Sequence, residues 1–276
     1  MTHPPSSTGN SIVFDRAVGY YDLTRGFPAG VEHQAAELFV KAGALTRTSG
    51  VLEVGIGTGR IALPLAPRVG VIHGVDLSRP MMGRLWEKRT SEPITLTEGN
   101  ALQLPFKSSS FDAVVIVHVL HLIPQWQAVL GEIARVLRPG GLLLAGAGGG
   151  STHSDVWQPL WDAFNSVVPA SDTQRVGMTG WVEVELPALG WRIVGEKHQL
   201  TYQFERPPQH FLDGIRNRIW SGMWRVSDED LARAYEVTLD AARMHFTDLD
   251  KPISLEGDFV VHAFSPPDAV SLSPTT

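Results

Sequence analysis

Apolar runs and helical patterns alternate along residues 51–148. The short apolar segments bounded by turn residues are predicted strands, and they lie at 51–55, 71–76, 94–100, 111–119 and 142–148. Between them, apolar residues recur at helical spacing in three segments, at 60–69, 78–90 and 126–137. The segment 111–119 is apolar on both faces, which is typical of a buried parallel strand. This alternation predicts a doubly wound α/β sheet with right-handed crossovers.

The pattern changes after Gly150. Apolar residues at helical spacing predict a helix that begins at Ser154 and further helices at 178–189, 208–220 and 228–246. Ser227 precedes the last of these as an N-cap. Extended strands are predicted at 191–204 and 258–264. Because two helices are too large for a hairpin turn, we expect a helical cap, at about 205–250, inserted between the last two strands.

Composition and charge restrict the function classes. The 276 residues are 43% hydrophobic with a formal net charge of −6 and no long basic run, which argues against nucleic acid as a partner. The absence of cysteine excludes a disulfide framework, a cysteine zinc site and a thiol nucleophile. The histidines show no paired spacing with acids that predicts a metal site, so we expect no metal.

Neither a signal peptide nor a membrane span is predicted. The N-terminus has no apolar signal core, and the longest nearly apolar run, 113–123, is shorter than the roughly 20 residues that cross a bilayer. We therefore expect a cytoplasmic protein with no membrane partner, either a monomer or a homodimer.

A glycine-rich loop follows the first predicted strand, in the sequence VLEVGIGTGR at 51–60. In parallel sheets ligands lie beyond the carboxyl ends of the strands, and glycine lets the backbone approach them closely. A dinucleotide fingerprint needs a third small residue where Arg60 stands, and no lysine followed by Ser or Thr marks a P-loop. Glu53, just before the loop, would repel a pyrophosphate. The loop therefore favours a cationic ligand.

Polar residues also end the next two predicted strands. Asp76 ends the second, where a carboxylate can accept both hydroxyl protons of a ribose and would repel a phosphate on it. Asn100 ends the third and is followed by Ala101, and a side-chain amide with neighbouring backbone groups can bind an adenine edge. Together these strand ends describe an adenosine with a positive tail and no phosphate, which fits S-adenosylmethionine.

Five stretches resemble the class I S-adenosylmethionine-dependent methyltransferases. They occur in the family's order and spacing: EVGIGTG (53–59), GVDLSRPMM (74–82), GNALQLPFKSSSFD (99–112), VHVLHLIP (117–124) and EIARVLRPGG (132–141). The resemblance implies a Rossmann-like, mostly parallel sheet of seven strands whose last strand is antiparallel. It also implies that Gly55 and Gly57 line the methionine portion, Asp76 the ribose, and Asn100 with Ala101 the adenine. The family often has Asp where Asn100 stands.

The segment AVGYYDLTRGFP, at 17–28, resembles the N-terminal strip that folds over the cofactor in many of these enzymes. By that resemblance Tyr21 would donate to the cofactor carboxylate and Arg25 would pair with it. The whole predicted cofactor set is Tyr21, Arg25, Glu53, Gly55, Gly57, Thr58, Gly59, Asp76, Leu77, Met81, Asn100, Ala101, Leu102 and His118. The predicted division is a strip at 1–30, a cofactor-binding core at 31–150, the rest of the sheet with its cap at 151–264, and a tail at 265–276.

Two histidines lie at or just after the carboxyl end of the fourth predicted strand, close to the position of a transferred methyl group. Each of His118 and His121 is either held by backbone groups or acts as a general base or substrate contact, so both are candidate catalytic residues. Trp220, Met223 and Trp224 form either the core of the cap or a wall of the substrate pocket.

The predicted function is methyl transfer to a small organic molecule by in-line displacement from S-adenosylmethionine. The stretch after the fourth strand lacks the asparagine-proline-proline-tyrosine type of motif, which argues against amino-group methylation of nucleic acids or glutamine. Two alternatives stay open, a nicotinamide-dependent oxidoreductase on a similar sheet and a non-catalytic protein that binds S-adenosylmethionine. Arg60 and Glu53 argue against the oxidoreductase.

Overall fold

The computed structural model describes residues 11–148, 155–173 and 176–268. Within these ranges the chain forms one seven-stranded sheet in the order β3-β2-β1-β4-β5-β7-β6. The strands are β1 (Val51–Val54), β2 (Ile72–Asp76), β3 (Ile94–Glu98), β4 (Phe111–Val117), β5 (Leu137–Gly148), β6 (Arg192–Arg206) and β7 (Ile253–Ser265). Only β7 runs antiparallel to its neighbours, β5 and β6. The predicted fold class is therefore confirmed, including the antiparallel last strand.

Helices cover both faces of the sheet because its central strands are apolar on both faces. On β4, Ala113 and Val115 pack in one buried cluster while Val114 and Ile116 pack in another. The first cluster includes residues of α2 (Val31–Ala42), α3 (Ala62–Leu65) and α4 (Arg79–Lys88). The second includes residues of α5 (Trp126–Val136) and α8 (Val182–Ala188). The period of two along β4 thus produces the three-layer arrangement.

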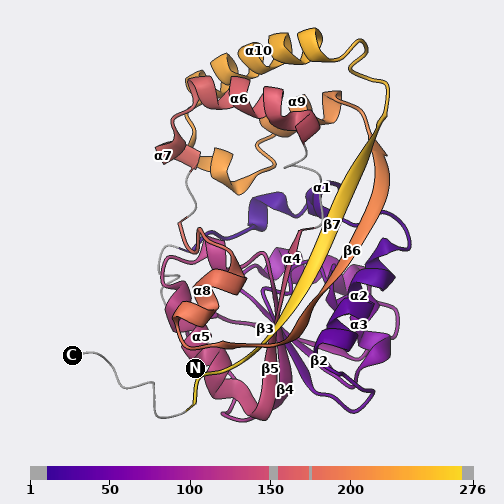
Figure 1. Cartoon of the computed structure of the whole chain (residues 1–276), viewed down its shortest axis with the longest axis vertical. Coiled ribbons are helices and arrows are strands. Elements are labelled where there is room, and N and C mark those ends of the chain that lie inside the picture. Colours follow the sequence, from indigo (N-terminus) through magenta and orange to yellow (C-terminus); the bar gives the residue numbers. More distant parts are fainter. Residues whose placement is uncertain (1–10, 149–154, 174–175, 269–276) are drawn as a thin grey trace, which may run out of the picture.

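The cap stands apart from these layers, at the far end of the long ribbon that β6 and β7 form (Figure 1). Between these strands lie α9 (Gln209–Arg216), the 3-10 helix η5 (Ser221–Arg225) and α10 (Asp228–His245). Their apolar residues share a buried cluster with α6 (Gln158–Val167), which precedes β6 in the chain. The cap therefore combines the inserted helices with an earlier helix that the sequence analysis had not assigned to it.

Several predicted helices are shorter in the structure. The segment predicted as one helix at 60–69 forms only α3 and the 3-10 turn η2 (Ala66–Arg68), because Pro67 lacks the amide that would continue an α-helix. The helix predicted at 208–220 ends at Arg216, and Arg218 then adopts a left-handed φ of 51°. The helix predicted at 178–189 begins only at Val182.

Some predicted features have other outcomes. Ser154, the predicted start of a helix, lies outside the described residues. Arg138–Gly141 was predicted to separate helix from strand, but these residues form the first part of β5. None of the helices in the described ranges is long and apolar enough to cross a bilayer.

Candidate active site

The glycine loop turns sharply at the carboxyl end of β1. Gly55, Gly57 and Gly59 have positive φ angles of 73°, 53° and 78°, which other residues adopt only with strain. A Cβ atom at Gly55 would lie 2.3 Å from Val119 Cγ2, whereas at Gly57 the nearest atom would be Met81 Cε at 3.6 Å. The loop is thus tightly packed at Gly55, whereas a Cβ atom at Gly57 would meet only an ordinary van der Waals contact. This leaves room for a ligand against the Gly57 backbone.

Asp76, at the end of β2, supports that loop. Its Oδ2 accepts a hydrogen bond from Gly57 N at 2.8 Å, and its Oδ1 accepts one from Ser78 N at 2.8 Å. Burial raises the pKa of Asp76 above its usual range, although these backbone bonds oppose the change. Each carboxylate oxygen has a second lone pair, so the group can still accept two ribose hydroxyls. That role of Asp76 stays a prediction.

Glu53 lies beneath the loop, with only 4% of its surface exposed. Its carboxyl group accepts a hydrogen bond from the Ala62 amide, while its Oε2 has no partner among the described residues. Burial raises the pKa of Glu53 to about 8, and the charge of Arg60 only partly offsets this. A buried carboxyl oxygen without a donor is a place where a cation or a donor group fits. S-adenosylmethionine, which carries both an ammonium and a sulfonium, fits that requirement.

The loop after β3 is ordered by its own backbone. Asn100 is 7% exposed, and its Oδ1 accepts a hydrogen bond from Leu102 N at 2.9 Å. The Asn100 carbonyl also accepts a hydrogen bond from Gln103 N at 3.0 Å. Ala101 is buried beside it. The adenine role of Asn100, Ala101 and Leu102 stays a prediction. The Asn100 side-chain oxygen, which would accept from the adenine amino group, already accepts one hydrogen bond from a backbone amide.

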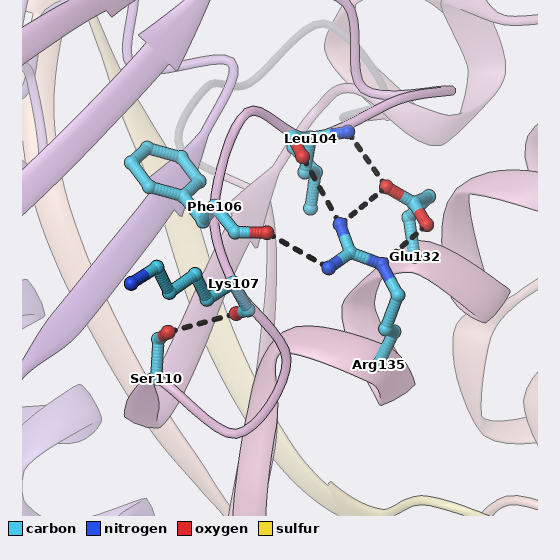
Figure 2. A network of polar contacts seen from close by, with 6 residues as sticks. All are labelled: Leu104, Phe106, Lys107, Ser110, Glu132 and Arg135. Atoms are coloured by element: carbon cyan, nitrogen blue, oxygen red, sulfur yellow. Dashed lines mark hydrogen bonds and ion pairs between the residues drawn. The ribbon is translucent and has the colours of Figure 1, made fainter.

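Helix α5 holds the next part of that loop through two charged residues (Figure 2). Glu132 Oε2 accepts a hydrogen bond from Leu104 N at 2.7 Å, and Arg135 donates to the carbonyls of Leu104 and Phe106 at 3.0 and 2.8 Å. The two side chains also pair with each other, from Arg135 Nε to Glu132 Oε1, at 2.7 Å. The motif EIARVLRPGG thus fixes the adenine-side loop from the neighbouring helix, a role that the sequence analysis did not assign.

The N-terminal segment is tied to the carboxyl ends of the strands by acids. Asp22, in α1 (Tyr21–Arg25), accepts a hydrogen bond from the Thr58 hydroxyl at 2.6 Å and pairs with Lys88 at 2.8 Å. Asp15 accepts from the Ser78 hydroxyl at 2.6 Å. These contacts attach the strip to the glycine loop and to α4. The sequence analysis missed both acids, although Asp22 follows Tyr21 in the motif that carried the resemblance.

The other predicted cofactor residues lie around this junction. Tyr21, Arg25 and Leu77 are half-buried, and Met81 is 2% exposed. The Thr58 hydroxyl is already donated to Asp22. Arg25 has no hydrogen-bonded or ionic side-chain partner in the described part of the chain, and burial lowers its pKa. An Arg without a counter-ion suits the carboxylate that the resemblance implies, and this pairing stays a prediction.

His118 follows β4 directly, in a left-handed conformation with φ of 55°. Its Nε2 lies 2.7 Å from the Gly148 carbonyl, which can only accept, so Nε2 carries the proton and Nδ1 is the basic atom. Surrounding protein and the charge of Arg60 lower the pKa of His118, so the ring is neutral at neutral pH. Because the ring still meets solvent, the lowering is smaller than full burial would cause. The His121 ring centre lies 6.4 Å away, in the 3-10 turn η3 (Leu120–Leu122).

The aromatic residues at the join of the cap helices divide into two kinds. Met223 is 2% exposed, and Trp220 packs on Trp161 and Phe211 with ring centres 5.2 and 5.4 Å apart, so both belong to the cap core. Trp224 contacts Phe14 at 4.9 Å between ring centres, and it donates to the Arg218 carbonyl at 2.7 Å. Trp224 therefore joins the cap to the N-terminal segment.

Two surface hollows lie elsewhere. One is lined by Val18, Gly19 and the outer side of α4, and the other lies along α10 and includes Arg216. Neither is lined by a predicted cofactor residue. We locate the site at the strand ends and the glycine loop, because ligands of parallel sheets bind at the carboxyl ends of the strands. The less crowded Gly57 backbone and the unpartnered Glu53 oxygen also lie at this end of the sheet.

The chain is similar in sequence to known methyltransferases. Residues 52–145 match a family model described as a methyltransferase domain. The chain is 34% identical over 133 residues to a demethylmenaquinone methyltransferase of Lactiplantibacillus plantarum, covering 45% of this chain and 56% of the relative. It is 29% identical over 203 residues to the ubiquinone/menaquinone biosynthesis C-methyltransferase UbiE of Allorhizobium ampelinum, covering 70% and 72%. The matched segments thus span only part of these relatives.

A solved structure, the [4+2]-cyclase SpnF, matches with a TM-score of 0.55 at 17% identity, over 97% of this chain and 99% of that one. At this identity the likeness concerns the fold alone.

Residues 52–145 therefore form a methyltransferase domain, and the resemblance to class I S-adenosylmethionine-dependent methyltransferases that the five motifs indicated is confirmed for this part of the chain. Proteins with this domain use S-adenosylmethionine, so the predicted cofactor agrees with the domain.

Proposed function

We propose that this protein transfers the methyl group of S-adenosylmethionine to a small organic molecule. The observation that carries the proposal is the loop between β1 and α3. Its backbone is less crowded at Gly57 than at Gly55 and is held by Asp76, and an unpartnered carboxyl oxygen of Glu53 lies beneath it. This combination suits a nucleoside with a cationic tail better than a pyrophosphate, because the Asp76 carboxylate would repel phosphate and the donor-free oxygen of Glu53 can accept from an ammonium.

The reaction is an in-line displacement at carbon. The bond from sulfur to the methyl carbon breaks with its electron pair going to sulfur, a bond from the acceptor atom to that carbon forms, and S-adenosylhomocysteine leaves. The protein's contribution is to align the acceptor and to exclude water. Where the acceptor atom carries a proton, His118 is the candidate base. Its Nδ1 would take the proton, because its Nε2 donates to the Gly148 carbonyl.

Two measurements test this proposal. We expect S-adenosylhomocysteine to raise the melting temperature of the protein, whereas NAD and NADP leave it unchanged. Stabilisation by NAD or NADP alone would instead support the oxidoreductase alternative. Incubation with methyl-labelled cofactor and a metabolite extract should then label one or a few small molecules.

Absence of any label together with cofactor binding would favour the non-catalytic alternative. The fold likeness to a [4+2]-cyclase makes this second measurement necessary, because a methyltransferase-like fold alone does not establish methyl transfer.

A further inference from the structure

Three side chains share one face of β6, and that face meets the N-terminal segment at Phe27. Tyr202, Phe204 and Arg206 are buried or half-buried, while the alternate residues of the strand are exposed. The Tyr202 ring crosses over Gly257 of β7, where a Cβ atom would lie 2.6 Å from it. Its centre is 6.3 Å from that of Phe27, in the N-terminal segment. The inner face of the ribbon is therefore continuous with the strip that covers the glycine loop.

Arginines lie along this face. The Arg60 guanidinium stacks on Phe27 at 4.8 Å from the ring centre, and its Nη1 donates to the Arg25 carbonyl at 2.8 Å. The Arg206 guanidinium lies 5.2 Å from the centre of Phe204, whose ring is 5.9 Å from that of Tyr202. Arg25, Arg60 and Arg206 thus form one group, which we call the arginine cluster.

The arginine cluster has no acid of its own. Within residues 11–148, 155–173 and 176–268, none of its three members forms an ion pair, and Arg25 and Arg206 have no side-chain hydrogen bond either. Burial lowers the pKa of Arg25, and the charges of Arg60 and Arg206 lower it further, while the neighbouring Tyr21 opposes the change. Partly buried guanidinium groups that have no acidic partner favour the binding of an anion.

Nearby ionisable groups do not supply that charge. Glu53 is largely protonated at neutral pH because burial raises its pKa to about 8. His118 and His210 are neutral or positive, and Asp258, which acts on Tyr202, is exposed. The cofactor brings one carboxylate but also an ammonium and a sulfonium. Binding it to Arg25 would therefore leave the site more positive than before.

We infer that the methyl acceptor carries an acidic group, a carboxylate or a phosphate, which binds Arg206 and Arg60 while Arg25 holds the cofactor carboxylate. This inference rests on the proposed function. Arginine presents a planar fork of donors that matches either anion. The Tyr202 hydroxyl lies on the same inner face and can donate to it as well. The acid would thereby orient the acceptor between the ribbon and the glycine loop.

Matched acid and amide probes test this inference on the full chain saturated with S-adenosylhomocysteine. We would measure binding by calorimetry for benzoate against benzamide, glutarate against glutaramide, and phenyl phosphate against phenol, at constant ionic strength. At least one acid should bind at least tenfold more tightly than its neutral partner. The phenyl phosphate and carboxylate arms distinguish the two kinds of acid.

Substitutions of Arg206 test whether this residue binds the acidic group of the probe. Arg206→Met should weaken the best acid about 10- to 100-fold, because an ionic hydrogen-bonding partner is lost, while the affinity for S-adenosylhomocysteine changes less than about twofold. Arg206→Lys keeps the charge without the fork and should give an intermediate affinity. Arg192→Met is the matched control on the same strand, since Arg192 pairs with Asp268 at the exposed end of β6. It should leave acid binding unchanged.

The possible failures are distinct. Equal affinity for acids and amides, no binding of any acid, or full acid affinity in a folded Arg206→Met variant would each overturn the inference and leave the proposed function standing. Failure of the unaltered protein to bind S-adenosylhomocysteine would overturn the proposed function itself.

Discussion

The two sides of the candidate site use their charged residues differently. On the side of the glycine loop, Asp15, Asp22 and Asp76 each accept hydrogen bonds from loop or helix donors, so their charge holds the protein together. On the side of the β6–β7 ribbon, Arg25 and Arg206 have no such partner in the described ranges. The acids therefore mainly stabilise the folded site, whereas the two arginines lack such a partner among the described residues and can bind a ligand.

Glu53 is the exception on the loop side, and it gives the largest expected effect. Its folded pKa of about 8 lies above its ordinary value of 4.5, so the folded state binds the proton more tightly than the unfolded state. The stability that this provides is complete below about pH 4.5 and is lost as the pH rises toward 8. Glu53→Gln has no such loss. We expect the variant to be more stable than the unaltered protein by about 2–4 kcal/mol at pH 8 and equally stable near pH 4.5.

Urea unfolding of both proteins between pH 4.5 and pH 8.5 measures this difference. A stability difference that does not change with pH would contradict the raised pKa. Asp112→Asn serves as the control, because the Gly50 amide and the Arg138 pair outweigh burial and lower the pKa of Asp112. Its carboxylate therefore stabilises the fold above its unfolded pKa, which lies below this pH range, so the stability difference of this variant should stay nearly constant from pH 4.5 to pH 8.5.

Asp76 gives the next largest effect, in binding. Asp76→Ala removes the acceptor for Gly57 N and, by our prediction, for the ribose hydroxyls. The affinity for S-adenosylhomocysteine should fall by about 1.5–3 kcal/mol. Asp76→Asn keeps one acceptor oxygen and should lose less. Calorimetry measures both, and an unchanged affinity of the alanine variant would remove Asp76 from the binding site.

Local patterns predicted the glycine loop and the strand end at Asp76, whose roles in binding stay predictions. The spacing of Gly55, Gly57 and Gly59 after an apolar strand, with Asp76 at the next strand end, is a local signal, because each residue's position follows from the element that precedes it. The antiparallel last strand was implied by the resemblance to the methyltransferases, whereas the parallel part of the sheet follows from the same alternation. These features depend on short-range periodicity, which a single sequence carries.

Long-range pairings were not predictable in the same way. The packing of α6 against the inserted helices joins segments on either side of β6. The apolar pattern of α6 predicts a buried face but not which helices that face packs against. The contacts of Asp22 with Thr58 and Lys88 join residues far apart in the chain. The left-handed φ of His118 follows from its hydrogen bond to Gly148 and from tertiary packing, and it has no local signal such as glycine.

The smallest expected effect concerns the attachment of the N-terminal strip through Asp22. Asp22→Asn weakens the ion pair with Lys88 and the bond from Thr58, both partly exposed, so the loss of folding stability should stay below about 1 kcal/mol. The affinity for S-adenosylhomocysteine should nevertheless fall about three- to tenfold, because Tyr21 and Arg25 belong to the same helix. Asp112→Asn is again the matched control, since Asp112 pairs with Arg138 at the amino end of β4, the end opposite the glycine loop. Equal affinities of the two variants, measured by calorimetry, would mean that the strip does not position cofactor-binding residues.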